Sequence, residues 1–361
     1  NVIFCGRNIL ETGLLSEAKD NRRLSIVYRI YAKEKAMKIG FCYDTKSDYG
    51  YSEENLEYTD FVSLETISEI GKAIEQNGYE IEYIGNVYKL QDQLINNTFN
   101  CDLIFNIAEG FGSRNREALL PGLLELYKIP HTASDIYGMS VNLNKHHTKI
   151  LAESIGVPTA KGYCFEHLSN EIINQIKTLN FPFVLKPNCE GGSMGLYLIH
   201  SISEFLEKSQ FLINTYSFEL LAEEYIKGTE ITVPIIGNGK DAKALGVVTI
   251  LNEDGTNIDL YNNSLKQIDN VINNPQFIYG DKLKKQIMKY SLDIHRFFRL
   301  QDYSRMDFRI SPDGIPYFLE INAMPSLCRD CSFEQCGKIA GLSYYEVIGK
   351  IIDAARKRYN I

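Results

Sequence analysis

The sequence predicts an α/β protein whose N-terminal part is built around a parallel sheet. Between residues 38 and 106, three short apolar segments alternate with two segments of helical spacing, joined by short links. Strands that alternate with helices in this order form parallel sheets, which bind ligands at the carboxyl ends of their strands. Further along, residues 303–310 and 315–321 alternate between polar and apolar side chains around a strong turn signal, which predicts an antiparallel hairpin.

Length and composition narrow the class of protein. The chain has 361 residues, enough for two or three domains, and its 44% apolar and 23% charged residues are typical of a soluble globular protein. A net charge of -8 argues against general nucleic-acid binding, which depends on concentrated positive charge. No apolar run reaches about 18 residues and no signal peptide is evident, so we expect no membrane partner. The scattered cysteines favour a reducing cytoplasm.

The elements of the parallel-sheet part follow from local patterns. The strands are expected at residues 38–43, 79–84 and 103–106. The intervening helices are expected at residues 63–77 and 90–96, and Gly78 is a stop signal for the first. Residues 1–36 precede the first strand as an extension whose role the sequence does not reveal.

The loop after the third strand, residues 107–117, is rich in charge and glycine where such folds bind ligands. Two interpretations stay open: a ligand-binding loop, or a helix N-terminal loop with capping charges. Helices are expected next at residues 118–127 and 145–155, with Gly156 closing the second.

A strand at residues 181–186 ends in Lys186 and leads into a glycine-rich turn, residues 190–195, before another strand at 196–199. Backbone N–H groups can surround phosphate oxygens only where side chains do not crowd them, so this turn suits a phosphate cover. Glycine-rich turns between strands are also common, and the pattern alone does not separate the two.

Residues 220–226 predict an apolar strand that carries Glu223, followed by a turn, Glu230 and a second apolar strand at 231–236. Such a segment can offer backbone groups and a carboxylate to the edge of an adenine, or it can be a plain hairpin with exposed acids. Residues 252–275 are polar and irregular and predict a long loop of the kind used as a lid or binding loop.

The predicted hairpin places charged side chains together. Because opposed residues of antiparallel strands share a face, a two- or four-residue loop would pair Arg305 with Glu320 and bring Asp307 and Asn322 to the same side. A three- or five-residue loop would put Glu320 and Asn322 on the opposite face. Two carboxylates, an amide and an arginine suit nucleotide-bound Mg²⁺ and a phosphoryl transition state; a solvated face with a surface ion pair is the alternative.

Three cysteines near the C-terminus, Cys328, Cys331 and Cys336, have a partial metal-ligand spacing. No second pair and no histidine accompany them, so we interpret them as ordinary thiols in a loop rather than a zinc site.

Taken together, the motifs resemble those of the ATP-grasp superfamily and, within it, the D-alanine–D-alanine ligase group, over roughly residues 37–355. Their order makes the resemblance specific. In chain order they are Asn144-Lys145, Phe183-Val184-Leu185-Lys186-Pro187, Glu190-Gly191-Gly192-Ser193-Met194-Gly195, Glu223-Glu224-Tyr225-Ile226, Glu230, Arg305-Met306-Asp307 and Glu320-Ile321-Asn322-Ala323-Met324-Pro325. The resemblance implies an ATP-grasp fold with a Rossmann-like pre-ATP-grasp domain at residues 37–132, a central subdomain at 133–226 and a C-terminal subdomain at 227–361.

The resemblance also implies roles. ATP phosphates would be contacted by Lys145, Lys186 and the loop Gly191, Gly192 and Ser193. The base and ribose would be held by Glu223, Tyr225, Ile226 and Glu230. The metal ligands would be Asp307, Glu320 and Asn322, for two ions of Mg²⁺ or Mn²⁺. The catalytic residues would be Arg305, Glu109 and Ser193.

The substrate positions depart from the group. The group's amine-contacting glutamate is missing from residues 43–48, Glu109 stands where the group has histidine, and Gly192 replaces a loop serine. The serine that grips the acceptor carboxylate aligns with Cys331. The remaining substrate candidates are Arg114, Arg116, Ser326, Arg329 and Ser332.

We therefore expect an ATP- and Mg²⁺-dependent carboxylate–amine ligase that forms an acyl phosphate and acts on amino acids or a short peptide, without naming D-alanine. A kinase on the same fold that phosphorylates a hydroxyl, and a non-catalytic nucleotide-binding scaffold, are the alternatives. We expect no nucleic-acid partner and a cytoplasmic location, and the resemblance allows a homodimer.

Overall fold

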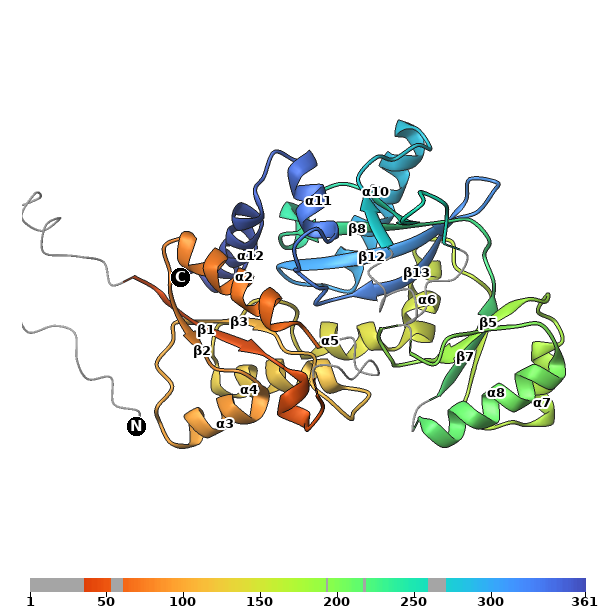
Figure 1. Cartoon of the computed structure of the whole chain (residues 1–361), viewed down its shortest axis with the longest axis horizontal. Coiled ribbons are helices and arrows are strands. Elements are labelled where there is room, and N and C mark those ends of the chain that lie inside the picture. The colour runs from red at the N-terminus through yellow and green to blue at the C-terminus, as the bar shows by residue number, and fades with distance from the viewer. Residues whose placement is uncertain (1–35, 53–60, 193, 217–218, 259–270) are drawn as a thin grey trace, which may run out of the picture. The chain divides into compact units, whose positions relative to one another are not determined.

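Three β-sheets organise the chain in the computed structural model, which describes residues 36–52, 61–192, 194–216, 219–258 and 271–361. All three belong to one unit, Lys38–Ile361 (Figure 1). None of the described helices is both long and apolar enough to cross a membrane.

The first sheet is parallel, with strand order β2-β1-β3. Its strands are β1 (Lys38–Tyr43), β2 (Glu80–Tyr83) and β3 (Leu103–Ile107). Helix α2 (Leu64–Gln76) begins at Ser63, whose side chain accepts a hydrogen bond from the Thr66 N–H, and α3 (Val87–Ile95) follows β2. The prediction of a parallel sheet with these strands is confirmed, and the predicted second helix begins three residues earlier than expected.

Helices and turns carry the chain from this sheet to the next. After β3 come the 3₁₀ segment η2 (Arg116–Ala118) and the helices α4 (Leu119–Tyr127), α5 (Ile136–Leu143) and α6 (Lys145–Ser154). Another 3₁₀ segment, η1 (Lys46–Tyr49), lies earlier in the chain, between β1 and α2. Asn144 ends α5 and caps α6, since its side chain accepts from the His147 N–H. Helix α6 lies against β13 of the third sheet (Figure 1).

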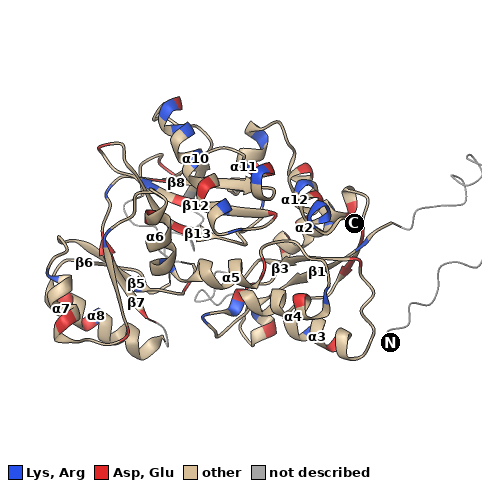
Figure 2. Cartoon of the chain, turned by 180° about the vertical axis from the view of Figure 1, so that it is seen from behind, with Lys and Arg blue, Asp and Glu red and all other residues tan. Residues whose placement is uncertain are grey.

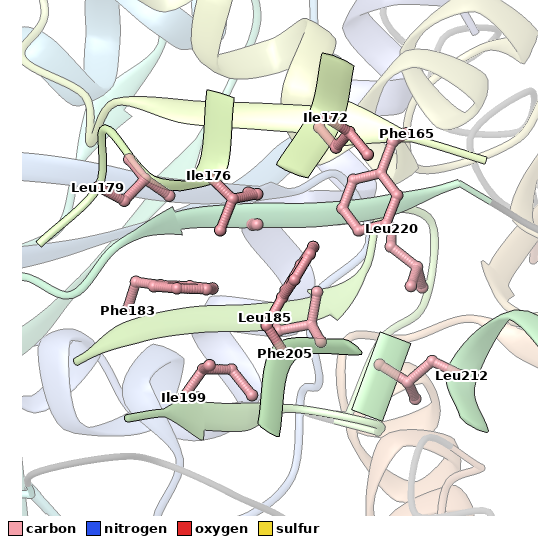
Figure 3. Close-up of a cluster of buried hydrophobic side chains, with 11 residues drawn as sticks. Phe165, Ile172, Ile176, Leu179, Phe183, Leu185, Ile199, Phe205, Leu212 and Leu220 are labelled. Atoms are coloured by element: carbon pink, nitrogen blue, oxygen red, sulfur yellow. The ribbon is translucent and has the colours of Figure 1, made fainter. Parts of the chain in front are cut away.

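The second sheet is antiparallel, with strand order β4-β7-β5-β6. Its strands are β4 (Gly162–Phe165), β5 (Phe183–Pro187), β6 (Tyr197–Ile199) and β7 (Leu220–Glu224). Helices α7 (Asn170–Ile176) and α8 (Ile202–Thr215) pack on it, and Phe183, Leu185 and Phe205 lie within the buried core between them (Figure 3). This core fixes β5 and β7, the strands that carry Lys186 and Glu223.

The third sheet has the order β11-β10-β8-β12-β13, with β9 paired to β8. Its strands are β8 (Thr229–Ile236), β9 (Lys243–Ala244), β10 (Val248–Asn252), β11 (Val271–Asn274), β12 (Tyr303–Ile310) and β13 (Pro316–Asn322). The accompanying helices are η3 (Gly239–Asp241), α10 (Asp281–Phe297), α11 (Ser332–Ile339) and α12 (Tyr344–Tyr359). Basic and acidic residues are interspersed along α10 and α11 (Figure 2).

The structure bears on two of the predicted loops. Of the two interpretations left open for the segment around Glu223 and Glu230, it excludes the plain hairpin, because β7 and β8 belong to different sheets and residues 225–228 connect them. The predicted loop at 252–275 ends in a strand, since β11 pairs with β10 along Val271–Asn274. Residues 259–270 of that loop lie outside the described residues.

The predicted hairpin register also needs correction. Ile310 pairs with Pro316, so five residues separate β12 and β13, and Arg305 pairs with Asn322 rather than Glu320. The register shifts between Asp307 and Phe308, which leaves Leu319 as an extra residue in β13. With a five-residue connection alone, Glu320 and Asn322 would lie on the face opposite Arg305. The bulge at Leu319 returns them to the same face.

Candidate active site

A cavity of about 610 Å³ lies where the three sheets approach one another. Its lining includes most of the residues singled out from the sequence: Glu109, Lys145, Lys186, Gly191, Gly192, Glu223, Tyr225, Ile226, Glu230, Arg305, Asp307, Glu320, Asn322, Ser326, Cys331 and Ser332. Segments more than two hundred residues apart in the chain therefore contribute to one site, which no local pattern requires.

One wall of the cavity is the charged face of the β12–β13 hairpin. Arg305 forms a two-pronged ion pair with Asp307, with Nε 2.9 Å from Oδ1 and Nη2 2.8 Å from Oδ2. Asn322 Nδ2 donates to Asp307 Oδ2 at 2.9 Å, and Thr232 Oγ1 on the neighbouring strand β8 donates to Oδ1 at 2.6 Å. The Asp307 carboxylate is held in one orientation by donors from three strands.

Glu320 lies beside Asp307 on the same face. Its Oε2 is 3.2 Å from Lys145 Nζ, which also donates to the carbonyl oxygen of Glu190 at 2.6 Å. Burial alone would raise the pKa of Glu320, but Lys145, Lys186 and Arg305 outweigh it and lower the pKa to about 2. Glu320 is therefore ionised throughout the physiological range. Oxygen donors from Asp307, Glu320 and Asn322 on one face suit a hard divalent cation such as Mg²⁺.

A second group of charges lies at the end of β7. Glu223 is buried between Lys186, at 2.7 Å, and Lys149, to which it is also paired. Burial raises the pKa of Glu223, but the two lysines outweigh it and lower the pKa to about 2. Lys149 was missed from the sequence, although its spacing of four residues from Lys145 puts both on one face of α6.

Arg309 was also missed as a site residue. It is 4% exposed, lines the cavity, and donates from Nη2 to Glu230 Oε2 at 2.7 Å. Burial raises the pKa of Glu230, and Arg309 opposes the rise. Its place on the same strand face as Arg305 and Asp307 was the signal that could have identified it.

The glycine-rich turn closes another side. Gly192 and Gly195 have φ values of +61° and +66°, a conformation that favours glycine. Gly191 and Gly192 line the cavity, whereas Ser193 lies outside the described residues. The backbone of this turn, together with Lys145 and Lys186, forms a region suited to an anionic ligand.

The opposite end of the cavity is lined by Glu109 and Glu117, together with Ser63 at the start of α2. Asn142 Nδ2 donates to Glu117 Oε2 at 2.8 Å, and Asn142 Oδ1 accepts from the Ala323 N–H at 3.3 Å. Asn142 therefore links Glu117 to Ala323, the residue that follows Asn322.

The loop before Glu117 folds tightly onto itself. Gly110 donates its N–H to the buried Asp44 Oδ2 at 2.8 Å, and a Cβ at Gly110 would lie 2.4 Å from the Arg116 carbonyl oxygen. Glycine is therefore required there, and the loop takes the conformation that brings Glu109 to the cavity.

Three of the predicted substrate residues do not line the cavity. Arg114 is exposed, with Nη1 3.9 Å from Glu219. Arg116 is buried behind the glycine-rich turn, with Nη1 2.9 Å from the Cys189 carbonyl oxygen. Arg329 pairs with Glu334 and Glu69 and lies over the ring of Tyr344.

The interpretation of the C-terminal cysteines as ordinary thiols is wrong for two of them. Cys328 and Cys331 form a disulfide, and both line the cavity next to Ser332. Cys336 is a buried free thiol. Spacing alone does not distinguish a disulfide from two thiols; the loop after Asn322 brings the two side chains together.

Comparison with known proteins shows the family of this chain. The family model described as D-ala D-ala ligase C-terminus matches residues 151–353, more than half of the chain. The chain belongs to the D-alanine–D-alanine ligase family. It thereby falls in the class of ATP-dependent carboxylate–amine ligases with an ATP-grasp fold.

Individual relatives align along most of the chain. The D-alanine–D-alanine ligase of Aquifex aeolicus is 28% identical over 291 residues, 81% of this chain and 94% of that protein. The uncharacterized protein y4sG of Sinorhizobium fredii is 30% identical over 259 residues, 71% of this chain and 75% of that protein.

Solved structures share the fold. The crystal structure of a D-alanine–D-alanine ligase from Bacillus anthracis complexed with ATP superposes with a TM-score of 0.71 at 23% identity, covering 90% of this chain and 98% of that one. The VanG D-Ala:D-Ser ligase from Enterococcus faecalis gives a TM-score of 0.71 at 20% identity, covering 89% and 100%. The predicted ATP-grasp fold with an N-terminal parallel sheet is confirmed.

Proposed function

We propose that this chain uses ATP to convert a carboxylate into an acyl phosphate, which an amine then attacks to give an amide. The observation that carries the proposal is the shared face of Arg305, Asp307, Glu320 and Asn322, opposed in one cavity by Lys145 and Lys186. A scaffold that only binds a nucleotide does not need this concentration of charge around the reacting phosphate.

The nucleotide would lie along the first part of the cavity. Lys145, Lys186 and the turn from Gly191 would contact its phosphates, because ammonium groups and open backbone N–H groups suit phosphate oxygens. The base would meet Glu223 and the backbone at Tyr225 and Ile226, and the ribose would meet Glu230. The similar Bacillus anthracis ligase structure is complexed with ATP, which supports ATP as the nucleotide.

Asp307, Glu320 and Asn322 would hold two divalent ions, Mg²⁺ or Mn²⁺. Their donor set fits, since it consists of two carboxylates and an amide oxygen on one face. When bound, the metal neutralises charge on the transferring phosphoryl group. Arg305, fixed by Asp307, supplies a further positive charge at the same face.

The steps require positioning more than a protein nucleophile. An oxygen of the substrate carboxylate attacks the γ-phosphorus and ADP leaves. The amine nitrogen then attacks the acyl carbon, inorganic phosphate leaves, and the nitrogen loses a proton. Arg305 would stabilise the negative charge that develops in both steps, and Glu109 faces the cavity at the end where the amine would arrive.

The substrates are proposed to be amino acids or a short peptide. The substrate end carries Glu109 and Cys331, where the resemblance to the group implies a histidine and a serine, so D-alanine is not assumed. Arg114, Arg116 and Arg329 are not proposed as substrate contacts, because they lie outside the cavity lining.

The test is release of ADP and phosphate by purified protein with ATP, Mg²⁺ and a panel of D- and L-amino acids and dipeptides, with products identified by mass. A condensed product whose mass equals the two substrates minus water supports the ligase. A phosphorylated product without condensation would favour a kinase, and failure of every pair to stimulate ADP release would count heavily against the proposal.

A further inference from the structure

Arg309 connects three segments at the end of the cavity away from Glu109. It pairs with Glu230 in register across β12 and β8, and their side chains form the 2.7 Å ion pair. Its Nη1 lies 3.5 Å from the Ile226 carbonyl oxygen, and its Nη2 lies 3.4 Å from that of Ile258. Its guanidinium carbon lies 5.8 Å from the centre of the Tyr225 ring. One side chain thus contacts the connection between two sheets, strand β8 and the segment after β10.

The ion pair of Arg309 with Glu230 is largely shielded from solvent, since the Arg309 side chain is 5% exposed. A guanidinium is always charged and presents its donors in a planar fork, so it restrains the rotation of a carboxylate as well as pairing with it. Glu230 is a half-buried carboxylate whose side chain is 15% exposed. Desolvation raises its pKa, and Arg309 favours its ionised form. An ionised carboxylate held in one orientation is a strong acceptor for a hydroxyl group.

We propose that Arg309 is a positioning residue for the nucleotide. It orients Glu230 toward a ribose hydroxyl and so sets how strongly the site prefers a ribonucleotide to a deoxyribonucleotide. This inference rests on the proposed function, because it takes the cavity as the ATP site. The alternative is that Arg309 only links the two sheets. Its replacement would then weaken the binding of every nucleotide equally.

Equilibrium binding separates the two roles without an amino-acid substrate. The full chain is titrated by calorimetry with ADP, 2′-deoxy-ADP and 3′-deoxy-ADP. For the native chain we expect ADP to bind roughly 10- to 100-fold more tightly than the analogue that lacks the hydroxyl held by Glu230, as for a hydrogen bond to a charged group.

Arg309→Met should weaken ADP binding and reduce that preference to about threefold or less, because Glu230 then lacks the guanidinium that holds it in one orientation. Arg309→Lys keeps the charge without the fork and should give an intermediate preference. The double variant with Glu230→Gln should show the same preference as Glu230→Gln alone, since the arginine acts through the glutamate.

Arg356→Met is the matched control. Arg356 also lies over a tyrosine ring, 5.9 Å from the centre of Tyr79, and donates to its hydroxyl at 3.1 Å, but it does not line the cavity. This variant should keep the full preference for ADP. Circular dichroism checks folding, and Arg309→Lys and Glu230→Gln carry the test if Arg309→Met does not fold.

Three results would overturn the inference. Equal weakening of all three nucleotides in Arg309→Met would assign Arg309 a structural role. A native chain that binds ADP and both analogues equally would show that Glu230 does not hold the ribose, while nucleotide binding stands. A native chain that binds no ADP at all would remove the proposed function itself.

Discussion

Asp307 lies directly opposite Glu320 across β12 and β13, although five residues separate the two strands. A five-residue connection alone would put Glu320 on the other face of the hairpin. Leu319 is the extra residue that shifts the register, and it returns Glu320 and Asn322 to the face of Arg305. The proposed metal site therefore depends on one bulge.

Replacement of Glu320 tests that face. We expect Glu320→Ala to lower the rate of ADP release by about 10²- to 10³-fold, the usual cost of removing one preorganised electrostatic group. The fold should persist, because the side chain is 31% exposed. Glu207→Ala, on a side chain that is 71% exposed on α8, is the control. Unchanged turnover in Glu320→Ala, measured beside circular dichroism, would remove the metal assignment.

Lys149 and Lys186 should contribute to different properties: Lys149 to the stability of the fold and Lys186 to the binding of ADP. Both pair with Glu223, but only Lys186 lines the cavity. We expect Lys149→Met to reduce the free energy of unfolding by about 3 kcal/mol, as for a broken buried ion pair, with a small change in ADP affinity. Lys186→Met should weaken ADP binding about tenfold or more, as for a lost hydrogen bond to a charged group. Urea unfolding and calorimetry measure the two effects, and equal loss of ADP affinity in both variants would contradict this division.

Acid should weaken the fold through Glu223. Its pKa of about 2 in the folded chain lies below the ordinary value of 4.5, so its ionised form stabilises the fold fully above pH 4.5. That contribution, at most about 3 kcal/mol, is lost as the pH falls from 4.5 toward 2. Glu223→Gln should be less stable at pH 7, and its deficit relative to the native chain should shrink at pH 3. A deficit that stays constant between these pH values in urea unfolding would contradict the assignment.

The Cys328–Cys331 disulfide should affect the amino-acid substrate rather than ATP. Both cysteines belong to the loop after β13, at the substrate end of the cavity. We expect the double serine variant to change the KM of the amino-acid substrate about three- to tenfold, equivalent to about 1 kcal/mol, and to leave the KM of ATP unchanged. Cys164→Ser, which replaces a free thiol in β4, is the control. Alkylation of both cysteines in the native chain without reductant would show that the disulfide is absent.

Local patterns predicted much of the fold. The strand at Tyr303–Ile310 has the predicted bounds, because alternation and the following turn are both encoded within a few residues. The helix after Ser63 was predicted for the same reason, since its cap and its stop at Gly78 are local. The order of the motifs gave the resemblance to a known family, and that resemblance supplied the roles proposed for the site residues.

The unpredicted features depend on tertiary structure. The bulge at Leu319 has no signal in the alternation of β13, and the separation of β7 from β8 into two sheets depends on which strands pair. Arg329 was a reasonable candidate for a substrate carboxylate, but its partner Glu334 lies on the same short stretch of chain and holds it outside the cavity. Pairings of this kind are decided by packing, so the sequence could supply candidates without choosing among them.

The most direct measurement follows oxygen through the proposed acyl phosphate. A carboxylate substrate found by the ADP-release screen is labelled with ¹⁸O in both carboxyl oxygens and incubated with the protein, ATP, Mg²⁺ and the amine. Attack of that carboxylate on the γ-phosphorus predicts one ¹⁸O atom in each inorganic phosphate released, with the other kept in the amide. Inorganic phosphate free of ¹⁸O, formed alongside ADP and an amide product, would contradict the acyl-phosphate mechanism.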